Sequence, residues 1–293
     1  MKKVTSVFIA TKPLQYINCT NIKRDHDNSV CCICDQFADS AKFFELCVQE
    51  GVFGSYRFFK TKEYGLLYWL FHQRQIKELY LDSDFGLLTR FVLLLFFSID
   101  VFIYEEGYAS YQPLRGNRTL KDKILLAIQK MMGIKNFNGG SCKVKGVYLY
   151  NKSKFDQAFP SHNKTILRFE TPFYDSVEQS KVLKALCDGV DWQMFDSKKI
   201  LIYLSSWDIS KEILDYCKNK EGVDMKILKL HPNIKNTPSE IVDDFDYILP
   251  SNIMFEYFYS KVREIVKGIF IVHHNTFAVE YIDEKDKVNA VVI

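Results

Sequence analysis

The feature that most constrains this chain is the regular alternation of short apolar runs with longer segments of helical spacing. Because a crossover between two parallel strands is usually a helix, such alternation is typical of parallel sheets with helices on both faces. In the first half, the expected strands are residues 4–10, Ser29–Cys34, Glu78–Leu81, 101–104 and 146–150, and the expected helices are 41–48, 64–75, 87–97 and 119–132.

A second series of the same kind begins at Lys199. Its expected strands are 200–204, 223–230, 246–249 and 269–272, with helices at 209–218 and 252–260 and another that starts at 277. The segment 151–198 between the two series contains Pro160 and Pro172 and no long periodic run, so we interpret it as a crossing between domains. We predict an α/β protein of two Rossmann-like domains, residues 1–185 and 186–293, that face a cleft.

Residues that favour helix ends are found where this scheme needs them. Thr11 is a candidate N-cap, and Pro13 suits the first turn of the helix that follows. Gly51 is expected to end the helix at 41–48. Asp208 or Ser206 is expected to cap the helix that begins at 209.

The net charge excludes one class of function. At +3 it is too small for a dedicated nucleic-acid binder. Met1-Lys2-Lys3 leads directly into a strand-like run instead of a signal-peptide core, so we expect a cytoplasmic protein with reduced thiols. Cys31-Cys32-x-Cys34 lacks a second pair at zinc-ribbon spacing, so we predict a buried strand there and no metal.

No apolar run reaches the roughly 20 residues that a membrane span needs. The nearest, FVLLLFF at 91–97, is interpreted as the end of a buried helix. Peripheral contact with the inner membrane stays open, and the sequence makes no prediction of oligomeric state.

Two polar segments follow expected strands. Residues 226–233, KILKLHPN, are expected to bring His231 and Pro232 to the carboxyl end of a strand, where ligands bind in open α/β sheets. Glu105-Glu106-Gly107 follows the strand at 101–104 in the same way. The alternatives are that His231 only opens a loop and that the two glutamates only form a solvated turn.

These residue types suit transfer of a sugar from a nucleotide. A carboxylate can take the proton of an acceptor hydroxyl, while a histidine or a helix N-terminus can hold the departing phosphate. Ser205 and Ser206 end the first strand of the second series, and they are equally good candidates for the phosphate and for helix capping.

The chain resembles the bacterial sialyltransferases of the lipooligosaccharide and capsule type, which have the two-domain GT-B fold. Glu105-Glu106-Gly107 matches the acidic-acidic-Gly motif of that family, and His231-Pro232 matches its His-Pro motif. The opening Thr11-Lys12-Pro13-Leu14-Gln15 is similar to the TPLQ-like start of the lipooligosaccharide branch.

The resemblance implies an inverting transfer of sialic acid from CMP-sialic acid to a terminal hydroxyl of a bacterial surface glycan, without a metal or another cofactor. The first domain would supply the base and the acceptor side, and the second would bind the nucleotide sugar. Glu106 is favoured as the base, with Glu105 open because the pleat sends the two side chains to opposite faces. His231 would contact the phosphate as an acid or as an electrostatic clamp.

Residues next to these motifs are further candidates for the site. On the donor side these are Gly107, Lys229, Pro232, Ser205 and Ser206, and on the acceptor side they are Thr11, Gln15 and Tyr108. Two departures from the family pattern affect the donor. His273-His274-Asn275-Thr276 stands where a Ser-Ser turn is expected, and Pro250-Ser251-Asn252 stands where Pro-x-Glu is expected, so Asn252 or Glu256 would contact the ribose.

Three other interpretations remain. Asp82-Ser83-Asp84 follows a strand and could hold a divalent ion in a metal-dependent glycosyltransferase, although Asp84 is an equally good helix cap. The donor could be another nucleotide sugar, either a CMP-linked keto acid or a UDP-hexose. The chain could also be a non-catalytic nucleotide-binding homologue that has kept the cleft but lost the chemistry.

Overall fold

The computed structural model describes residues 5–114, 119–131, 134–205, 209–231, 234, 239–273, 278–282 and 290–292. The chain divides into two compact units. Unit 1 comprises Met1–Gln36 and Ser40–Pro172, and unit 2 comprises Phe37–Asp39 and Phe173–Ile293. The division in sequence lies upstream of the boundary predicted at 185/186, which falls inside helix α8 (Lys181–Leu186).

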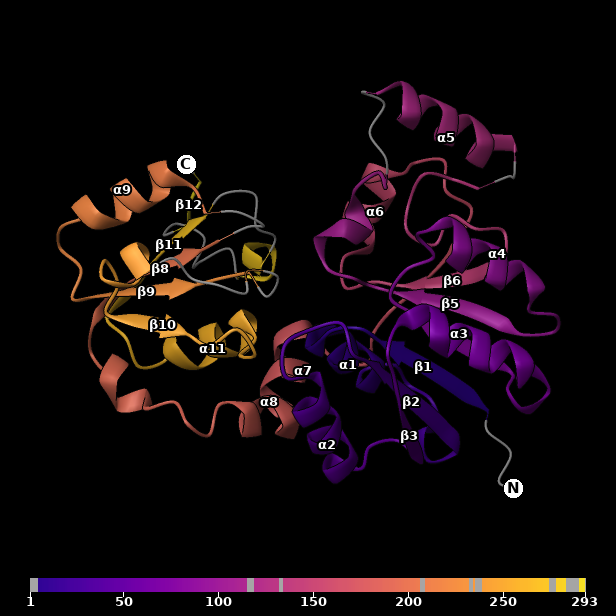
Figure 1. Cartoon of the computed structure of the whole chain (residues 1–293), viewed down its shortest axis with the longest axis horizontal. Helices are drawn as coiled ribbons and strands as arrows, with labels where there is room; N and C mark the ends of the chain where they lie inside the picture. The colour runs from indigo at the N-terminus through magenta and orange to yellow at the C-terminus, as the bar shows by residue number, and fades with distance from the viewer. Residues whose placement is uncertain are drawn as a thin grey trace. The chain divides into compact units, whose positions relative to one another are not determined.

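Unit 1 is built on a seven-stranded parallel sheet in the order β3-β2-β1-β4-β5-β6-β7 (Figure 1). The chain starts at β1, runs outward to β3, and then returns to the other side of β1 at β4, so the strand order reverses between β1 and β4. The strands are β1 (Ser6–Ala10), β2 (Ser29–Cys34), β3 (Ser55–Phe59), β4 (Glu78–Leu81), β5 (Asp100–Tyr104), β6 (Val144–Tyr148) and β7 (Thr165–Leu167).

Helices connect these strands, as the alternating pattern predicts for all but the last of them, which lies in the segment interpreted as a crossing between domains. They are α1 (Pro13–Thr20), α2 (Ser40–Glu50), α3 (Lys62–Phe71), α4 (Leu87–Leu95), α5 (Leu120–Met131) and α6 (Lys152–Ala158). Short 3-10 turns cover His26–Asn28, Gln73–Gln75 and Tyr108–Tyr111.

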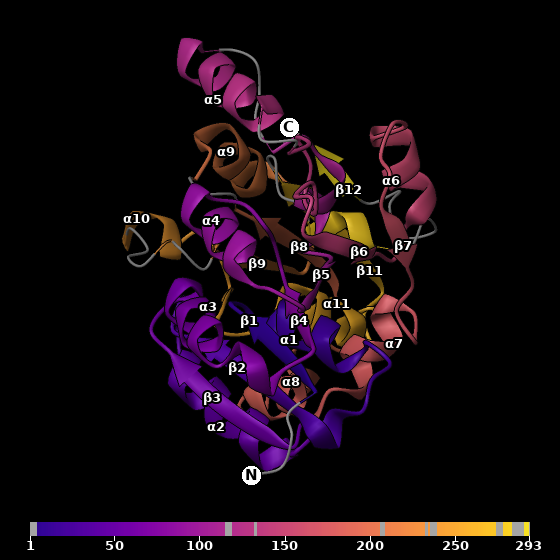
Figure 2. The ribbon, with the colours of Figure 1, turned by 90° about the vertical axis from the view of Figure 1, so that its right-hand side faces the viewer.

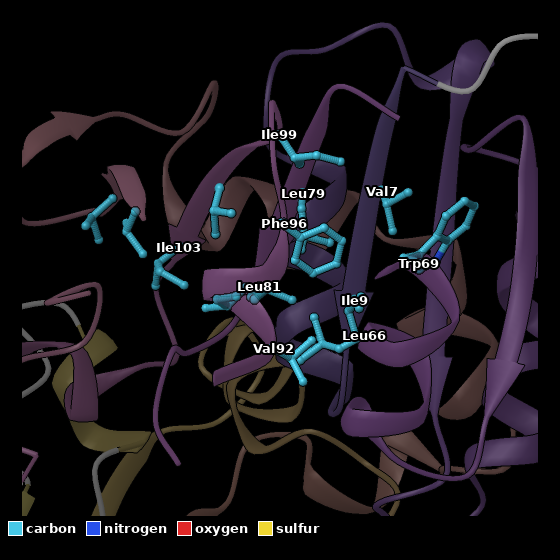
Figure 3. Packing of buried hydrophobic residues seen from close by; sticks show 14 of the residues in the cluster. Val7, Ile9, Leu66, Trp69, Leu79, Leu81, Val92, Phe96, Ile99 and Ile103 are labelled. Carbon is cyan, nitrogen blue, oxygen red and sulfur yellow. The ribbon is translucent and has the colours of Figure 1, made fainter. Parts of the chain in front are cut away.

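One face of the sheet packs against α3 and α4. Figure 3 shows Val7 and Ile9 of β1 beside Leu66 and Trp69 of α3. Val92 of α4 and Phe96, which follows that helix, belong to the same buried cluster. The other face carries a stack of aromatic rings, in which Phe8 lies 4.4 Å from Tyr80 and Tyr80 lies 5.1 Å from Phe102. Burial on both faces explains why β1 and β2 are apolar after their opening serines instead of alternating.

Unit 2 contains a five-stranded parallel sheet in the order β10-β9-β8-β11-β12, so its strand order reverses between β8 and β11. The strands are β8 (Lys199–Leu204), β9 (Met225–Lys229), β10 (Tyr247–Leu249), β11 (Gly268–His273) and β12 (Ala290–Val292). The helices are α7 (Phe173–Gln179), α8, α9 (Lys211–Asn219), α10 (Ser239–Val242) and α11 (Phe255–Val262), with 3-10 turns at Trp192–Phe195 and Ala278–Tyr281.

Several local predictions need correction. Lys12, and not Thr11, is the N-cap of α1, because the Thr11 side chain is used in a different contact. Ser210 caps α9 by accepting from the Ile213 N–H, so the predicted caps at 206 and 208, which lie outside the described residues, are not needed. Gly51 ends α2 with a positive φ of 70°, as predicted.

Three strands were not predicted. β3 is half exposed at the edge of its sheet, and β7 and β12 are each only three residues long, so none of them has a long apolar run. Among the helices in the described part of the chain, none has the length and apolar character that crossing a bilayer requires.

Candidate active site

The carboxyl edge of the unit 1 sheet gathers the polar residues that follow its central strands. Thr11 follows β1, Asp82 follows β4, and Glu105 and Glu106 follow β5. Because β1, β4 and β5 are adjacent and parallel, these side chains emerge at one edge, next to the point where the strand order reverses. That position is the usual ligand site of an open α/β sheet.

A buried carboxylate, Asp82, organises this edge. Its Oδ2 accepts hydrogen bonds from the Thr11 hydroxyl at 3.1 Å and from the Gln15 amide at 3.0 Å. Its Oδ1 accepts from the Ser83 N–H at 2.8 Å and from Lys62 Nζ at 3.0 Å. A buried carboxylate needs this many partners, since removing a charge from water is costly unless it is paired and hydrogen-bonded.

Lys62 is brought to Asp82 by the start of α3. Thr61 caps this helix, and Lys62 is its first residue, directly after the connection from β3. The ammonium is buried and also donates to the hydroxyl and the carbonyl of Ser83. Burial alone would lower the pKa of Lys62, but the carboxylates of Asp82 and Glu106 reverse that effect and raise it. Lys62 is therefore a fixed positive charge at the site.

Glu105 is a structural residue in this arrangement. Its side chain is completely buried, and its Oε2 accepts from the Tyr111 hydroxyl and from the Tyr150 N–H at 2.9 Å. Its backbone carbonyl accepts from the Asn18 side-chain amide at 2.7 Å. These contacts tie the end of β5 to α1 and to the segment after β6, and they occupy the carboxylate.

Glu106 points to the other side and remains accessible, with 24% of its side chain exposed. Its Oε1 lies 3.6 Å from Lys12 Nζ, and its backbone N–H donates to the Ser110 hydroxyl at 2.8 Å. Burial and then the negative charge of Asp82 raise the pKa of Glu106, while Lys12 and Lys62 partly counteract them. A carboxylate with a raised pKa and an open side has the properties of a general base.

The turn after Glu106 depends on Gly107. Its φ of 100° with ψ of −151° lies in a region that other residues avoid, and its carbonyl accepts from the Ser110 N–H at 3.0 Å. The predicted acceptor residues Thr11 and Gln15 are buried beneath the site, where they bind each other and Asp82. Their contact with an acceptor stays a prediction, and the side chain of Tyr108 lies outside the described residues.

In unit 2, the structure brings together three of the predicted donor residues. Ser205 follows β8, His231 lies just beyond β9, and His273 ends β11. The Ser205 hydroxyl accepts from the His231 N–H at 2.7 Å, and the Ser205 N–H donates to the Lys229 carbonyl at 3.0 Å. β11 pairs with β8, so that His273 lies beside Leu204 at the point where the strand order reverses.

Lys229 and Glu256 form a buried pair of titratable groups next to these residues. Lys229 Nζ donates to the carbonyls of Pro250 and Ser251 at 2.9 and 3.1 Å. Burial lowers the pKa of Lys229 to about 8 and raises the pKa of Glu256 to about 7, although the two charges attract each other. The Asn252 amide, predicted to contact a ribose, donates to Asp39 at 2.9 Å.

Five predicted donor residues lie outside the described residues and remain predictions: Ser206, Pro232, His274, Asn275 and Thr276.

The partners of Asp84 oppose the metal-site interpretation of Asp82-Ser83-Asp84. Asp84 is fully buried, and its carboxylate accepts from the N–H groups of Gly139 and Ser141 at 2.9 and 2.8 Å. Because these two N–H groups occupy its carboxylate, Asp84 is not a helix cap either. Asp82 is held by Lys62 and the other donors described above. Within the described segments, no group of three or more His, Cys, Asp or Glu side chains could hold a metal ion.

Sequence reasoning missed Lys12 and Lys62, and it considered Asp82 only as a metal ligand. For Asp82 the signal was available, because it follows a strand at the same edge as Glu106. Lys62 could not be placed without recognising β3.

No family model and no curated protein matches this sequence. Among solved structures, a 2,6-sialyltransferase from a Photobacterium species, in complex with CMP and lactose, gives a TM-score of 0.57 at 11% identity, covering 99% of this chain and 71% of the other. A protein from Listeria monocytogenes described as a UDP-N-acetylglucosamine 2-epimerase gives 0.54 at 9% identity, covering 96% and 76%. HepE from Anabaena, in complex with UDP-glucose, gives 0.53 at 9% identity, covering 99% and 85%.

These likenesses establish the fold. The chain has an α/β architecture of two Rossmann-like units of the GT-B type, as the sequence predicts.

The contrast between the two glutamates predicts different effects on stability. Glu105→Ala leaves the Tyr111 hydroxyl and the Tyr150 N–H without their buried acceptor, so we expect the free energy of unfolding to fall by about 2 kcal/mol or more. Glu106→Ala removes a carboxylate whose ionised form burial disfavours, so stability should be unchanged or higher. Urea denaturation of both variants measures this, and equal losses would contradict the assigned roles.

The burial of Glu256 predicts that the stability of the protein depends on pH. The pKa of Glu256 rises from an ordinary 4.5 to about 7 on folding, so its protonated form adds stability that is fully present below pH 4.5 and is lost as the pH rises through 7. That shift corresponds to about 3 kcal/mol. Glu256→Gln should therefore gain stability relative to the wild type between pH 5 and pH 8. Denaturation curves at the two pH values test this, and a constant difference would refute it.

Proposed function

We propose that this protein is a glycosyltransferase that transfers sialic acid from CMP-sialic acid to a terminal hydroxyl of a bacterial surface glycan, such as a lipooligosaccharide or a capsule. The observation that carries the proposal is Glu106, an accessible carboxylate with a raised pKa at the carboxyl edge of a parallel sheet. The fold likeness to a sialyltransferase bound to CMP and lactose supports the choice of donor and acceptor class.

Glu106 would act as the general base. Its carboxylate takes the proton of the acceptor hydroxyl as the hydroxyl oxygen forms a bond to the anomeric carbon of the sialic acid. The bond from that carbon to the phosphate oxygen breaks at the same time, CMP leaves with the bonding electrons, and the configuration inverts. Burial and the charge of Asp82 raise the pKa of Glu106 and so make it a stronger base, while Lys12 and Lys62 favour its ionised form.

Unit 2 would bind the nucleotide. His231 follows β9 and His273 ends β11, and these strands flank β8, which Ser205 follows. Imidazole groups at such an edge can donate hydrogen bonds to a phosphate or neutralise it. Lys229 would act through the loop that it holds, since its ammonium binds the carbonyls of Pro250 and Ser251. We propose that no metal or other cofactor takes part, and that the protein works in the cytoplasm.

A second candidate is a glycosyltransferase or related enzyme that uses a UDP-sugar. It is favoured by the fold likeness to HepE bound to UDP-glucose and to the protein described as a UDP-N-acetylglucosamine 2-epimerase. The departures from the sialyltransferase pattern at Asn252 and at His273–Thr276 also concern residues that the resemblance assigns to the donor. A non-catalytic nucleotide-binding protein is the third outcome that an assay must separate.

The direct test is release of CMP from CMP-sialic acid in the presence of a panel of galactosides, with UDP-sugars assayed in parallel. We expect turnover with the CMP donor, a loss of about 10²–10⁴-fold in Glu106→Gln with CMP binding retained, and a loss of both binding and turnover in His231→Ala.

Each other outcome has a defined meaning. Turnover with a UDP-sugar alone would reject the donor, and CMP binding without turnover of any donor would favour the non-catalytic protein. Wild-type kinetics in His231→Ala would remove that residue from the mechanism. Loss of activity in a correctly folded Glu105→Gln, with Glu106→Gln active, would exchange the roles of the two glutamates.

The charges around Glu106 predict opposite shifts of the pH profile. Activity that needs a general base rises with pH through the pKa of that base, which gives the acid limb of the pH profile. Because the pKa of Glu106 is raised, this limb should lie at a higher pH than an ordinary glutamate would give. Asp82→Asn removes a negative charge and should move the limb to lower pH, whereas Lys12→Met removes a positive charge and should move it to higher pH. Profiles of kcat/KM measure both shifts.

Lys77→Met is the matched control for these profiles. Lys77 precedes β4 at the opposite end of the strand from Asp82, and its side chain is exposed. It should leave the profile unchanged. Shifts of Asp82→Asn and Lys12→Met in the same direction would show that Glu106 does not control the acid limb.

A further inference from the structure

The outer face of α5 is apolar and exposed. Leu120, Ile124, Ile128 and Met131 are 75%, 53%, 40% and 87% exposed. Their spacing places them along one side of the helix. An amphipathic helix of a water-soluble domain normally turns such a stripe toward the core, so α5 presents the opposite arrangement.

The inner face of α5 is only loosely packed. Leu126 and Gln129 line a cavity of about 550 Å³, together with Phe137, Phe159 and His162. A helix of 12 residues is marginal in water without tertiary packing. The helix therefore has an apolar outer face that is not covered and an inner face that is only partly filled.

The segment around α5 is strongly basic. Between residues 113 and 135 the sequence contains six basic residues and a single acidic one, Asp122. The carboxylate of Asp122 is engaged at the start of the helix, where it accepts from the N–H and the hydroxyl of Thr119. The basic residues are Arg115, Arg118, Lys121, Lys123, Lys130 and Lys135.

Helix α4 also carries exposed apolar side chains. In both Figure 1 and Figure 2, α4 lies between α3 and α5. Leu88 and Phe91 on α4 are 52% and 59% exposed, and Phe97 just beyond the helix is 67% exposed. The one charged residue of α4, Arg90, is buried and donates to the Asp84 carbonyl, so it does not interrupt this face.

We propose that the exposed faces of α4 and α5 bind the surface of an anionic lipid bilayer, with α5 lying in the plane of the interface. An exposed apolar stripe flanked by lysines is the combination that such a surface recognises, because the apolar side chains enter the acyl boundary while the basic ones meet the headgroups. The net positive charge of this segment is the reason to choose an anionic bilayer over a protein partner. The proposal does not depend on the donor or on any catalytic residue.

Co-sedimentation with vesicles tests the proposal. The full chain should bind vesicles of phosphatidylcholine with phosphatidylglycerol, bind vesicles of phosphatidylcholine alone at least about tenfold more weakly, and lose affinity as salt is raised. The double variant Ile124→Glu with Ile128→Glu should lose binding to both. For the double variant Lys123→Glu with Lys130→Glu, the affinity for the anionic vesicles should fall by about fivefold or more per substitution, and binding to phosphatidylcholine alone should not change.

Controls come from α2, which carries an exposed apolar residue and an exposed lysine elsewhere in unit 1. Val48→Glu and Lys42→Glu should bind vesicles like the wild type. Thermal unfolding of each variant establishes that it is folded.

Three results would overturn the proposal. One is equal binding to both kinds of vesicle. Another is wild-type binding in the α5 variants. The third is a dimer, seen by light scattering, that the Ile124 and Ile128 substitutions dissociate while no vesicle binding occurs, since α5 would then be covered by a second copy of the chain.

Discussion

The buried carboxylate of Asp82 is the interaction on which the arrangement of unit 1 depends. It joins the turn after β1, through Thr11 and Gln15, to the start of α3, through Lys62, and to its own loop after β4. These segments lie far apart in sequence, and none would hold this geometry alone. Because a buried charge that loses its partners is strongly destabilising, the network fixes the carboxyl edge of the sheet and sets the electrostatic environment of Glu106.

The general architecture could be predicted from the sequence because its strands are buried on both faces. β2 was predicted with its exact bounds, since every residue of Ser29–Cys34 is apolar or small and all are buried. β3 could not be, because it is an edge strand whose residues are exposed or half exposed, so it lacks the apolar run that reveals the others. Missing β3 also concealed Lys62, which reaches Asp82 only because α3 begins directly after that strand.

The acidic pair shows where local sequence stops being informative. The strand pleat predicts that Glu105 and Glu106 point to opposite sides, but it does not say which side is buried. Glu105 takes the buried side because Tyr111 and Tyr150 donate hydrogen bonds to its carboxylate. Tyr150 belongs to a segment that reaches Glu105 only because β6 pairs with β5. Once these donors hold Glu105, Glu106 is left with the accessible side and the nearby lysines. The distinction is therefore tertiary in origin.

Unit 2 gives the same lesson for the residues next to Ser205 and His231. Lys229 and Glu256 were predicted separately as donor contacts, yet the structure places both in the interior. Burial there lowers the pKa of Lys229 and raises the pKa of Glu256, so that it favours the neutral form of each. Lys229 nevertheless keeps two carbonyl partners, and these belong to Pro250 and Ser251, the residues that lead into α11. A lysine at the end of β9 thus holds the loop after β10. Since Asn252 is the next residue of that loop, Lys229 helps to position a residue that was predicted to contact a ribose.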